Sequence, residues 1–347
     1  DDVLNSLIDT AYKQNLPLQI AGIRILEARA RLGIAVGNTY PQHQQARAGL
    51  SHVGLSENQP NFSPAIDETF LDLNAGFDIS WEMDLWGRFQ RGIEAADADM
   101  LVTIANYDDV MVSLTAGVAS AYTQIRTFEQ RLLIAKSNVE IQQNSLKIAT
   151  IRFENGVTTE LDLHQARALL LNTQASIPAL EIGLQQSKHA LSTLLGMQPG
   201  SIDKILVEDG TIPAALAEVA VGLPAELLRR RPDVRRAELQ TAAQSARIGI
   251  AEAELYPHFS LIGSIGLRSS DTFGSSLGDI FQADSIETFA GPSLSWNILN
   301  YGRIKNNVRV QDARLQQLIV AYQNTVLEAS REVEDALVGF IRSQEQV

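Results

Sequence analysis

The feature that most constrains the fold of this 347-residue chain is an internal repeat. Residues 31–41 return as residues 247–257, and residues 79–88 return as residues 294–303. The first match has an offset of 216 residues and the second an offset of 215, so the two are collinear apart from one residue. Two ordered matches indicate a duplicated unit. Any fold for this chain must therefore contain the same series of elements twice.

Each unit predicts a helix, a Tyr-Pro stop, a strand, a loop, a second strand, a Gly-Arg pair and a long helix. Pro41 and Pro257 end the preceding helices, because proline cannot extend a helix interior. The second unit has no counterpart to the stretch from about 136 to 195, so we expect a chain truncated at its C-terminus. The expected segments are helices over 1–38, a β-hairpin over 40–85, a helical hairpin over 88–195 with its tip at 155–162, a linker over 196–231, a helix over 232–255, a second β-hairpin over 256–299 and a truncated long helix over 303–347.

The predicted helices are too long for an ordinary globular domain. Residues 88–154 contain no proline and keep the apolar spacing of a coiled coil. At about 1.5 Å per residue this helix would span roughly 100 Å. Two apolar stripes on each long helix imply that each helix packs against two neighbouring helices, as in a closed ring of helices. The alternative is a two-stranded coiled coil, in which only one stripe is packed and the other is scattered apolar surface. The second stripe consists of Ile134, Ile141 and Ile148 on one helix and Leu161, Ala168, Ala175 and Ile182 on the other.

Apolar and polar residues alternate over 71–85, and the second unit repeats this alternation in two segments. Such strands are typical of outer-membrane barrels, although a half-exposed sheet on a soluble core gives the same pattern in one strand. Four strands cannot close a barrel, so several copies must pool their strands. The residues expected to face lipid are Leu73, Phe77, Ile79, Phe259, Leu261, Ile265, Leu294 and Trp296. The residues expected to face the lumen are Asp72, Asn74, Asp78, Ser80, Glu82, Asp84, Ser293, Ser295 and Asn297.

The first strand does not follow this pattern. The repeat alignment places polar residues at its outward positions, namely His43, Gln45, Arg47 and Gly49. Either its register is shifted, so that Ala46, Ala48 and Leu50 face outward, or this strand lies beyond the hydrocarbon zone.

Composition and motifs argue against several other classes of protein. The chain has 41 Asp and Glu against 28 Lys and Arg, a net charge of −13 that argues against phosphate-mediated nucleic-acid binding. The absence of cysteine excludes thiolate chemistry and Cys-ligated metals. The histidines show no metal-ligand spacing, and we expect no catalytic residue, cofactor or metal site. The acidic residues of the strands form either a hydrated face or an electronegative channel wall.

The turn between the two longest helices is a candidate docking surface. Gly156 favours a left-handed helix end, and Thr158 or Thr159 can cap the returning helix. A helical turn without any partner is the plain interpretation. The functional interpretation is a docking tip, because the protruding end of a long rod is the first surface that another assembly meets. The residues of this tip are Gly156, Val157, Thr158, Thr159, Glu160, Leu161 and Asp162.

Five segments together make the chain resemble a known family. They are Tyr40-Pro41, Tyr256-Pro257, residues 81–88, residues 153–163 and residues 222–233. In these segments the chain resembles the TolC-like outer-membrane factors of tripartite efflux pumps, specifically the OprM-like or NodT-type lipoprotein branch. The resemblance implies a homotrimer with a 12-stranded β-barrel, four strands per copy, continued by a periplasmic α-barrel. It also implies that the 196–231 segment joins an equatorial belt.

The resemblance further implies an exit duct in the outer membrane that works with a periplasmic adaptor and an inner-membrane efflux transporter. The adaptor would dock at the tip from Gly156 to Asp162, and helices at the periplasmic end would splay to open the channel. The family's lipidated N-terminal cysteine is absent from this chain, so a lipid anchor is expected only in a longer precursor. We therefore predict a passive efflux duct. The alternatives are a duct for type I protein secretion and, from another class, a soluble coiled-coil scaffold.

Overall fold

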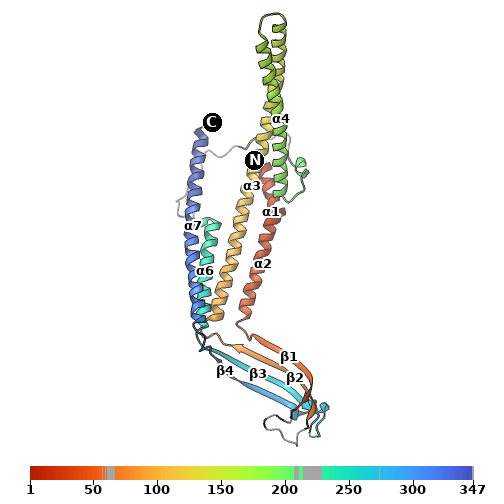
Figure 1. Ribbon diagram of the computed structural model, residues 1–347, viewed down its shortest axis with the longest axis vertical. Coiled ribbons are helices and arrows are strands. Elements are labelled where there is room, and N and C mark those ends of the chain that lie inside the picture. Colours follow the sequence, from red (N-terminus) through yellow and green to blue (C-terminus); the bar gives the residue numbers. More distant parts are fainter. Residues whose placement is uncertain are drawn as a thin grey trace. The chain divides into compact units, whose positions relative to one another are not determined.

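The computed structural model describes residues 1–56, 58, 60, 67–206, 211–213, 229–272 and 274–345 (Figure 1). The chain divides into two compact units. The first comprises Asp1–Arg24 and Ile104–Pro232, and the second comprises Ile25–Thr103 and Asp233–Val347. Among the described residues, no helix is both long enough and apolar enough to cross a membrane.

The first unit is helical. It contains α1 (Asp2–Gln14), the beginning of α2 (Leu16–Gly37), most of α3 (Arg88–Glu154), α4 (Glu160–Leu194) and the short helix η1 (Ser201–Lys204). Its core is formed by apolar side chains from all of these elements: Leu7, Ala11, Leu18, Leu114, Val118, Tyr122, Ile125, Leu191, Leu195 and Ile202. Burial of these side chains is what holds the long helices side by side.

A buried polar residue and a glycine join the helix ends within this unit. Asn15 is buried between α1 and α2, where its amide nitrogen donates to the carbonyl oxygen of Leu194 at 2.8 Å. Its side-chain oxygen accepts from the backbone N–H of Leu18 at 2.9 Å. Gly196 follows α4 with φ of 68°, and a Cβ at this position would lie 2.3 Å from the carbonyl oxygen of Gln14. The contact therefore requires glycine both for its backbone conformation and for space.

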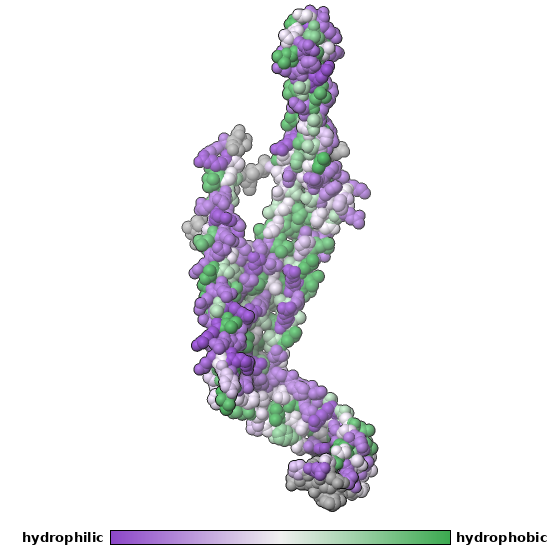
Figure 2. All heavy atoms as spheres, viewed as in Figure 1, coloured by the Kyte–Doolittle hydropathy of each residue, from purple (hydrophilic) through white to green (hydrophobic). Residues whose placement is uncertain are grey.

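The two apolar stripes of the long helices have different environments in a single chain. The first stripe packs inside the first unit, where Leu170 and Leu191 of α4 are buried. The second stripe is exposed, with Ile141 of α3 and Ile182 of α4 as examples. Figure 2 shows apolar residues on the outer surface of the α3–α4 hairpin up to its tip. An exposed, regularly spaced apolar stripe is typical of a surface that packs against a further helix.

The second unit contains a four-stranded antiparallel sheet in the order β1-β2-β3-β4. The strands are β1 (His43–Gly54), β2 (Thr69–Glu82), β3 (His258–Ser270) and β4 (Ile286–Ser295), and the short helices η2 (Leu277–Phe281) and η3 (Ala283–Ser285) lie between the last two. The remaining helices are α6 (Pro232–Ala253) and α7 (Arg303–Glu345). β1 and β4 are the two edges of this sheet, and neither edge is covered by another described strand of the chain.

The strand register explains why the first strand departs from the repeat pattern. His43 lies opposite Ser80 in the first hairpin, and His258 lies opposite Ser295 in the second. His258 and Ser295 follow His43 and Ser80 by 215 residues each, so the strands of the two repeats are related by an offset of 215. The two Tyr-Pro stops, in contrast, are 216 residues apart. The extra residue is therefore Gln42, which lies between the stop and the strand.

This insertion changes the face on which each β1 residue lies. Ala46, Ala48 and Leu50 lie opposite Phe77, Ala75 and Leu73, so they belong to the apolar face of the sheet. The outward positions obtained from the 216-residue offset, His43, Gln45, Arg47 and Gly49, are wrong, because they lie opposite polar or glycine residues of β2. A one-residue shift exchanges the two faces of a strand, and Gln42 supplies that shift.

Candidate functional site

The apolar face of the sheet is a continuous row of side chains across the strands. Phe77 of β2 lies between Ala46 of β1 and Ile265 of β3, and Phe259 of β3 lies opposite Leu294 of β4. Leu73, Ile79 and Leu261 share this face, because residues opposite each other in an antiparallel pair point to the same side. Several of these side chains are exposed in the single chain, as expected for a surface that contacts lipid.

The polar face carries acids that are paired with bases across the strands. Arg268 Nε of β3 lies 2.8 Å from the buried Asp72 Oδ1 of β2, and Arg47 Nε of β1 lies 3.3 Å from Asp78 Oδ2. The sequence allowed an electronegative wall, but the cross-strand bases compensate both of these charges. The same face carries Asn74 and Ser80 of β2 and Ser293 and Ser295 of β4, and also Glu287 and Phe289 of β4, so it is mixed rather than uniformly acidic.

Three residues predicted as part of the strands lie beyond their ends. β2 ends at Glu82, and the carboxylate of Asp84 accepts from the backbone N–H groups of Phe89 and Gln90 at the start of α3, at 3.2 and 2.8 Å. β4 ends at Ser295, so Asn297 and Trp296 also lie outside the sheet. The placement of Asp84 and Asn297 on the lumen face is therefore wrong: alternation continues in the sequence after the ladder has ended, and Asp84 caps a helix instead.

Two tryptophans, Trp81 and Trp296, form hydrogen bonds between the sheet and the segments that follow the preceding helices. Trp81 Nε1 donates to the carbonyl oxygen of Thr39 at 3.0 Å, and Trp296 Nε1 donates to the carbonyl oxygen of Leu255 at 3.0 Å. Thr39 and Leu255 each precede a Tyr-Pro stop, so the same contact occurs in both repeats. All three tryptophans of the chain, including Trp86, lie at this end of the sheet, as in the aromatic girdles of outer-membrane barrels.

Trp86 makes a further contact that joins the two repeats. Its ring stacks on Tyr256, with centroids 4.6 Å apart and planes inclined by 21°. Its Nε1 donates to the carbonyl oxygen of Pro257 at 2.8 Å. The loop after β2 in the first repeat is thereby held against the Tyr-Pro stop of the second repeat.

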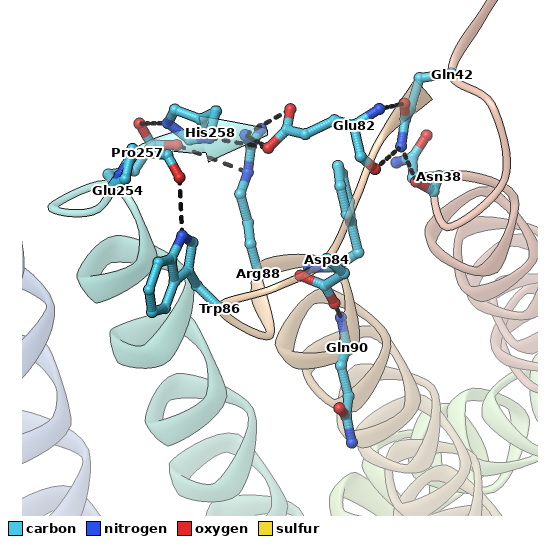
Figure 3. A network of polar contacts seen from close by, with 11 residues as sticks. Asn38, Gln42, Glu82, Asp84, Trp86, Arg88, Gln90, Glu254, Pro257 and His258 are labelled. Carbon is cyan, nitrogen blue, oxygen red and sulfur yellow. Dashed lines mark hydrogen bonds and ion pairs between the residues drawn. The ribbon is translucent and has the colours of Figure 1, made fainter. Parts of the chain in front are cut away.

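A charged network lies beside this stack (Figure 3). Glu82 Oε1 accepts from Arg88 Nη1 at 3.0 Å and lies 2.9 Å from His258 Nδ1. Arg88 Nε also lies 3.6 Å from Glu254 Oε1. The inserted Gln42 completes the network, since its amide bonds to both the N–H and the carbonyl of Glu82, at 2.7 and 3.2 Å. Glu82 was predicted only as a lumen residue, and no role was predicted from the sequence for Arg88, His258, Glu254 or Gln42, although the one-residue difference in repeat offset was a signal for Gln42.

The turn at the end of the α3–α4 hairpin is fixed by its own hydrogen bonds. Gly156 has φ of 72°, its N–H donates to Phe153 O, and the N–H of Val157 donates to Arg152 O, both at 2.9 Å. This double closure is the Schellman motif of a helix C-terminus. The turn therefore has a defined conformation, and Val157 is 73% exposed at its apex.

The beginning of α4 is capped by a second set of bonds. Thr159 and Asp162 form a capping box, in which the Asp162 carboxylate accepts from the Thr159 N–H at 3.0 Å. The Thr158 hydroxyl, followed by the N–H and hydroxyl of Thr159, lowers the pKa of Asp162 below its ordinary 3.8. Glu160 adds a negative charge to the first turn, and Leu161 is 64% exposed beside Val157's turn. The structure thus brings all seven predicted tip residues together.

The predicted linker and its arginine-rich motif are only partly described. Of residues 196–231, the described parts are 196–206, 211–213 and 229–231, and residues 222–228 of the motif lie outside the described residues. The predicted equatorial belt stays a prediction.

Comparison with known proteins decides the family. The family model "Outer membrane efflux protein" matches residues 7–197 and 223–347. The chain belongs to the outer membrane efflux protein family. It is 30% identical over 346 residues to nodulation protein T of Rhizobium leguminosarum bv. viciae, covering 99% of this chain and 68% of that protein. It is also 30% identical over 342 residues to the cation efflux system protein CusC of Escherichia coli O6:H1, covering 97% of this chain and 70% of that protein.

The fold agrees with this assignment. The outer-membrane channel OprN superimposes with a TM-score of 0.89 at 31% identity, covering 100% of this chain and 76% of that chain. The predicted fold class and efflux function are confirmed, and the coiled-coil scaffold is excluded. This efflux channel lies in the outer membrane with a periplasmic helical part, and its family consists of channel proteins. In such a trimer the open edges of β1 and β4 meet neighbouring copies, and contact of the apolar sheet face with lipid stays a prediction.

Proposed function

We propose that the channel is the passive exit duct of a tripartite pump and that a periplasmic adaptor docks at the tip formed by residues 156–162. The observation that supports this proposal is the exposure of Val157 and Leu161 on a turn that is already ordered. An apolar side chain on a rigid turn binds a partner without a large loss of conformational entropy. The capping box keeps the turn in this conformation before the adaptor arrives.

The inner-membrane transporter supplies the energy in this proposal, and the channel supplies the path. Docking of the adaptor biases the hairpin ends toward an open arrangement, because the adaptor gains more contact with the open tips than with the closed ones. The channel then conducts drugs or other small molecules outward. Relatives at the same 30% identity carry names as different as nodulation protein T and cation efflux system protein, which supports a duct that does not itself select the cargo.

The test is a double substitution at the tip, Val157→Glu with Leu161→Glu, in the full-length protein. We expect trimer mass and membrane yield to remain normal while efflux of a fluorescent dye from cells falls to the level of a deletion strain. The matched control is Gln165→Glu, which places a negative charge at an exposed position one turn further along α4. Normal efflux by the double variant, at normal expression, would contradict docking at this tip. Position 156 is a poor probe, since any side chain there would strain the turn.

A further inference from the structure

The internal repeat has a structural consequence at the open end of the second unit. The Trp86 loop of the first repeat contacts the Tyr-Pro stop of the second repeat within one chain. The corresponding loop of the second repeat contains Tyr301, and the corresponding stop of the first repeat is Tyr40-Pro41. In the single chain Tyr301 is 98% exposed and Tyr40 is also exposed.

Tyr301 has a second unusual property. With φ of 49° it is the only described residue other than glycine that has a positive φ. This backbone belongs to the turn over residues 300–303, in which the N–H of Arg303 donates to the carbonyl oxygen of Asn300 at 2.9 Å and Gly302 also has a positive φ, of 80°. The turn fixes the backbone of Tyr301, so the exposed ring is held in a defined place where a partner outside its own chain can contact it.

We propose that Tyr301 of one copy stacks on Tyr40 of the next copy, which reproduces between copies the contact that Trp86 and Tyr256 make within one. In a closed ring of three copies the two repeats alternate, so each first repeat has a second repeat on both sides. One contact between a first and a second repeat lies within the chain, where Trp86 stacks on Tyr256. We call it the internal junction. The other lies between copies, and the repeat predicts that it brings Tyr301 of one copy to Tyr40 of the next.

The open strand edges support the same arrangement of copies, because the repeat also predicts how β4 of one copy pairs with β1 of the next. Within the chain β2 pairs with β3 such that Ser80 lies opposite Ile262 and Ile79 lies opposite Gly263. Transferring both members by the 215-residue repeat places Ser295 of β4 opposite Arg47 of β1 in the next copy. It also places Leu294 opposite Ala48, so the apolar face of one copy continues into that of its neighbour. This agreement of faces is not guaranteed, because any odd shift of register would join lipid-facing to lumen-facing residues.

The charged groups differ between the two junctions. At the junction within the chain, Arg88 pairs with Glu82 and lies near Glu254. The residues that correspond to Arg88, Glu82 and Glu254 are Arg303, Asn297 and Asn38. The junction between copies therefore keeps the arginine and replaces both acids by amides. Its contacts are less dependent on salt than those of the internal junction, since no carboxylate faces Arg303 from the corresponding positions.

The chain has no cysteine, so pairs of introduced cysteines report on chosen contacts only. In the full-length protein, the double variant Tyr40→Cys with Tyr301→Cys is oxidised or treated with a short bismaleimide and run on a denaturing gel. We expect covalent dimers and trimers. Mixing Tyr40→Cys copies with Tyr301→Cys copies is expected to give dimers that neither single variant gives alone. The matched control, Trp86→Cys with Tyr256→Cys, should link within one copy without a gain in mass.

A strand pair tests the register separately. The hydrogen bond from Met83 N to Phe259 O places the ladder bonds at odd positions of β2, so the Ser80–Ile262 pair is of the closer, non-hydrogen-bonded kind. The corresponding pair, Ser295→Cys with Arg47→Cys, is expected to link copies at least tenfold more than Ser295→Cys with Ala46→Cys, whose second thiol lies on the opposite face. The native mass of each variant is measured first, so that a failure to form trimers is recognised.

The outcomes separate this proposal from docking at the tip, which none of these variants touches. Trimers of normal mass that fail to link through residues 40 and 301 would overturn the stacking. Trimers that link more strongly through residues 295 and 46 than through residues 295 and 47 would overturn the register. Links through residues 40 and 301 inside single copies would overturn the alternation of repeats.

Discussion

The assignment of the two sheet faces predicts opposite effects for neighbouring residues of β3. Ile265 and Ser264 lie near the middle of this strand, at nearly the same depth in the membrane. Ile265 lies opposite Phe77 on the apolar face and is 58% exposed in the single chain. Ser264 lies opposite Asp78 on the polar face. Lysine at the two positions therefore has the same charge and depth but a different environment.

The expected magnitudes follow from these environments. Lysine on the lipid face near the bilayer midplane costs about 2–4 kcal/mol, and therefore about 6–12 kcal/mol for the three copies of a trimer. At 1.4 kcal/mol for each factor of ten, Ile265→Lys should lower the folding equilibrium of one copy by roughly 30- to 700-fold. Ser264→Lys lies between Asp78 and Phe289 on the polar face, and is expected to change stability by no more than about 1 kcal/mol.

The assay compares the two variants in the same strain and the same detergent. The amount of trimer in the membrane fraction is measured first, followed by the guanidinium midpoint of the purified trimer. Ile265→Lys should reduce both quantities strongly, whereas Ser264→Lys should resemble the parent. Equal effects of the two lysines would refute the assignment of one face to lipid and the other to the lumen.

Two further predictions concern the first unit. Gly196→Ala should destabilise that unit by more than the roughly 1–2 kcal/mol of a left-handed alanine, because its Cβ would meet the Gln14 carbonyl oxygen. The control is Gly200→Ala, since Gly200 also has a positive φ, of 89°, but open space around it. Equal melting temperatures of the two variants would contradict the contact between residue 196 and Gln14. The pKa of Asp162 is lowered on folding, so its stabilisation of the α4 start is present above pH 3.8 and is lost as pH falls through the lowered pKa. Hydrogen exchange of residues 155–165 should therefore show protection at pH 6 in the parent and in Glu160→Gln but not in Asp162→Asn, and equal protection in all three would show that the carboxylate does not hold the cap.

Strict periodicity made the faces of β2, β3 and β4 predictable, because alternation is a local property of a strand. The positions of Phe77, Phe259 and Leu294 on one face follow from spacing alone, without knowledge of any partner strand. The ends of the strands were less predictable. The alternation continues to Leu85, but the ladder stops at Glu82, where the carboxylate of Asp84 is needed at the start of α3.

The charges on the polar face could not be read from the sequence. Asp72 and Arg268 are separated by 196 residues along the chain and meet only because β2 and β3 are neighbours. The same holds for Glu82 and His258, which are 176 residues apart. An ion pair across strands depends on strand order and register, and neither is a local property of the sequence.

The sequence by itself determined the duplicated unit, the long helices, the faces of three strands and the turn at residues 156–162, because each depends on periodicity or on residues close together in the chain. Only the tertiary structure decided the face of β1, the pairing of the acids and the stack of Trp86 on Tyr256. The physical reason is that one inserted residue, Gln42, leaves the local pattern of the strand unchanged but reverses which side it presents. That reversal has an energetic consequence only when a partner strand fixes the register.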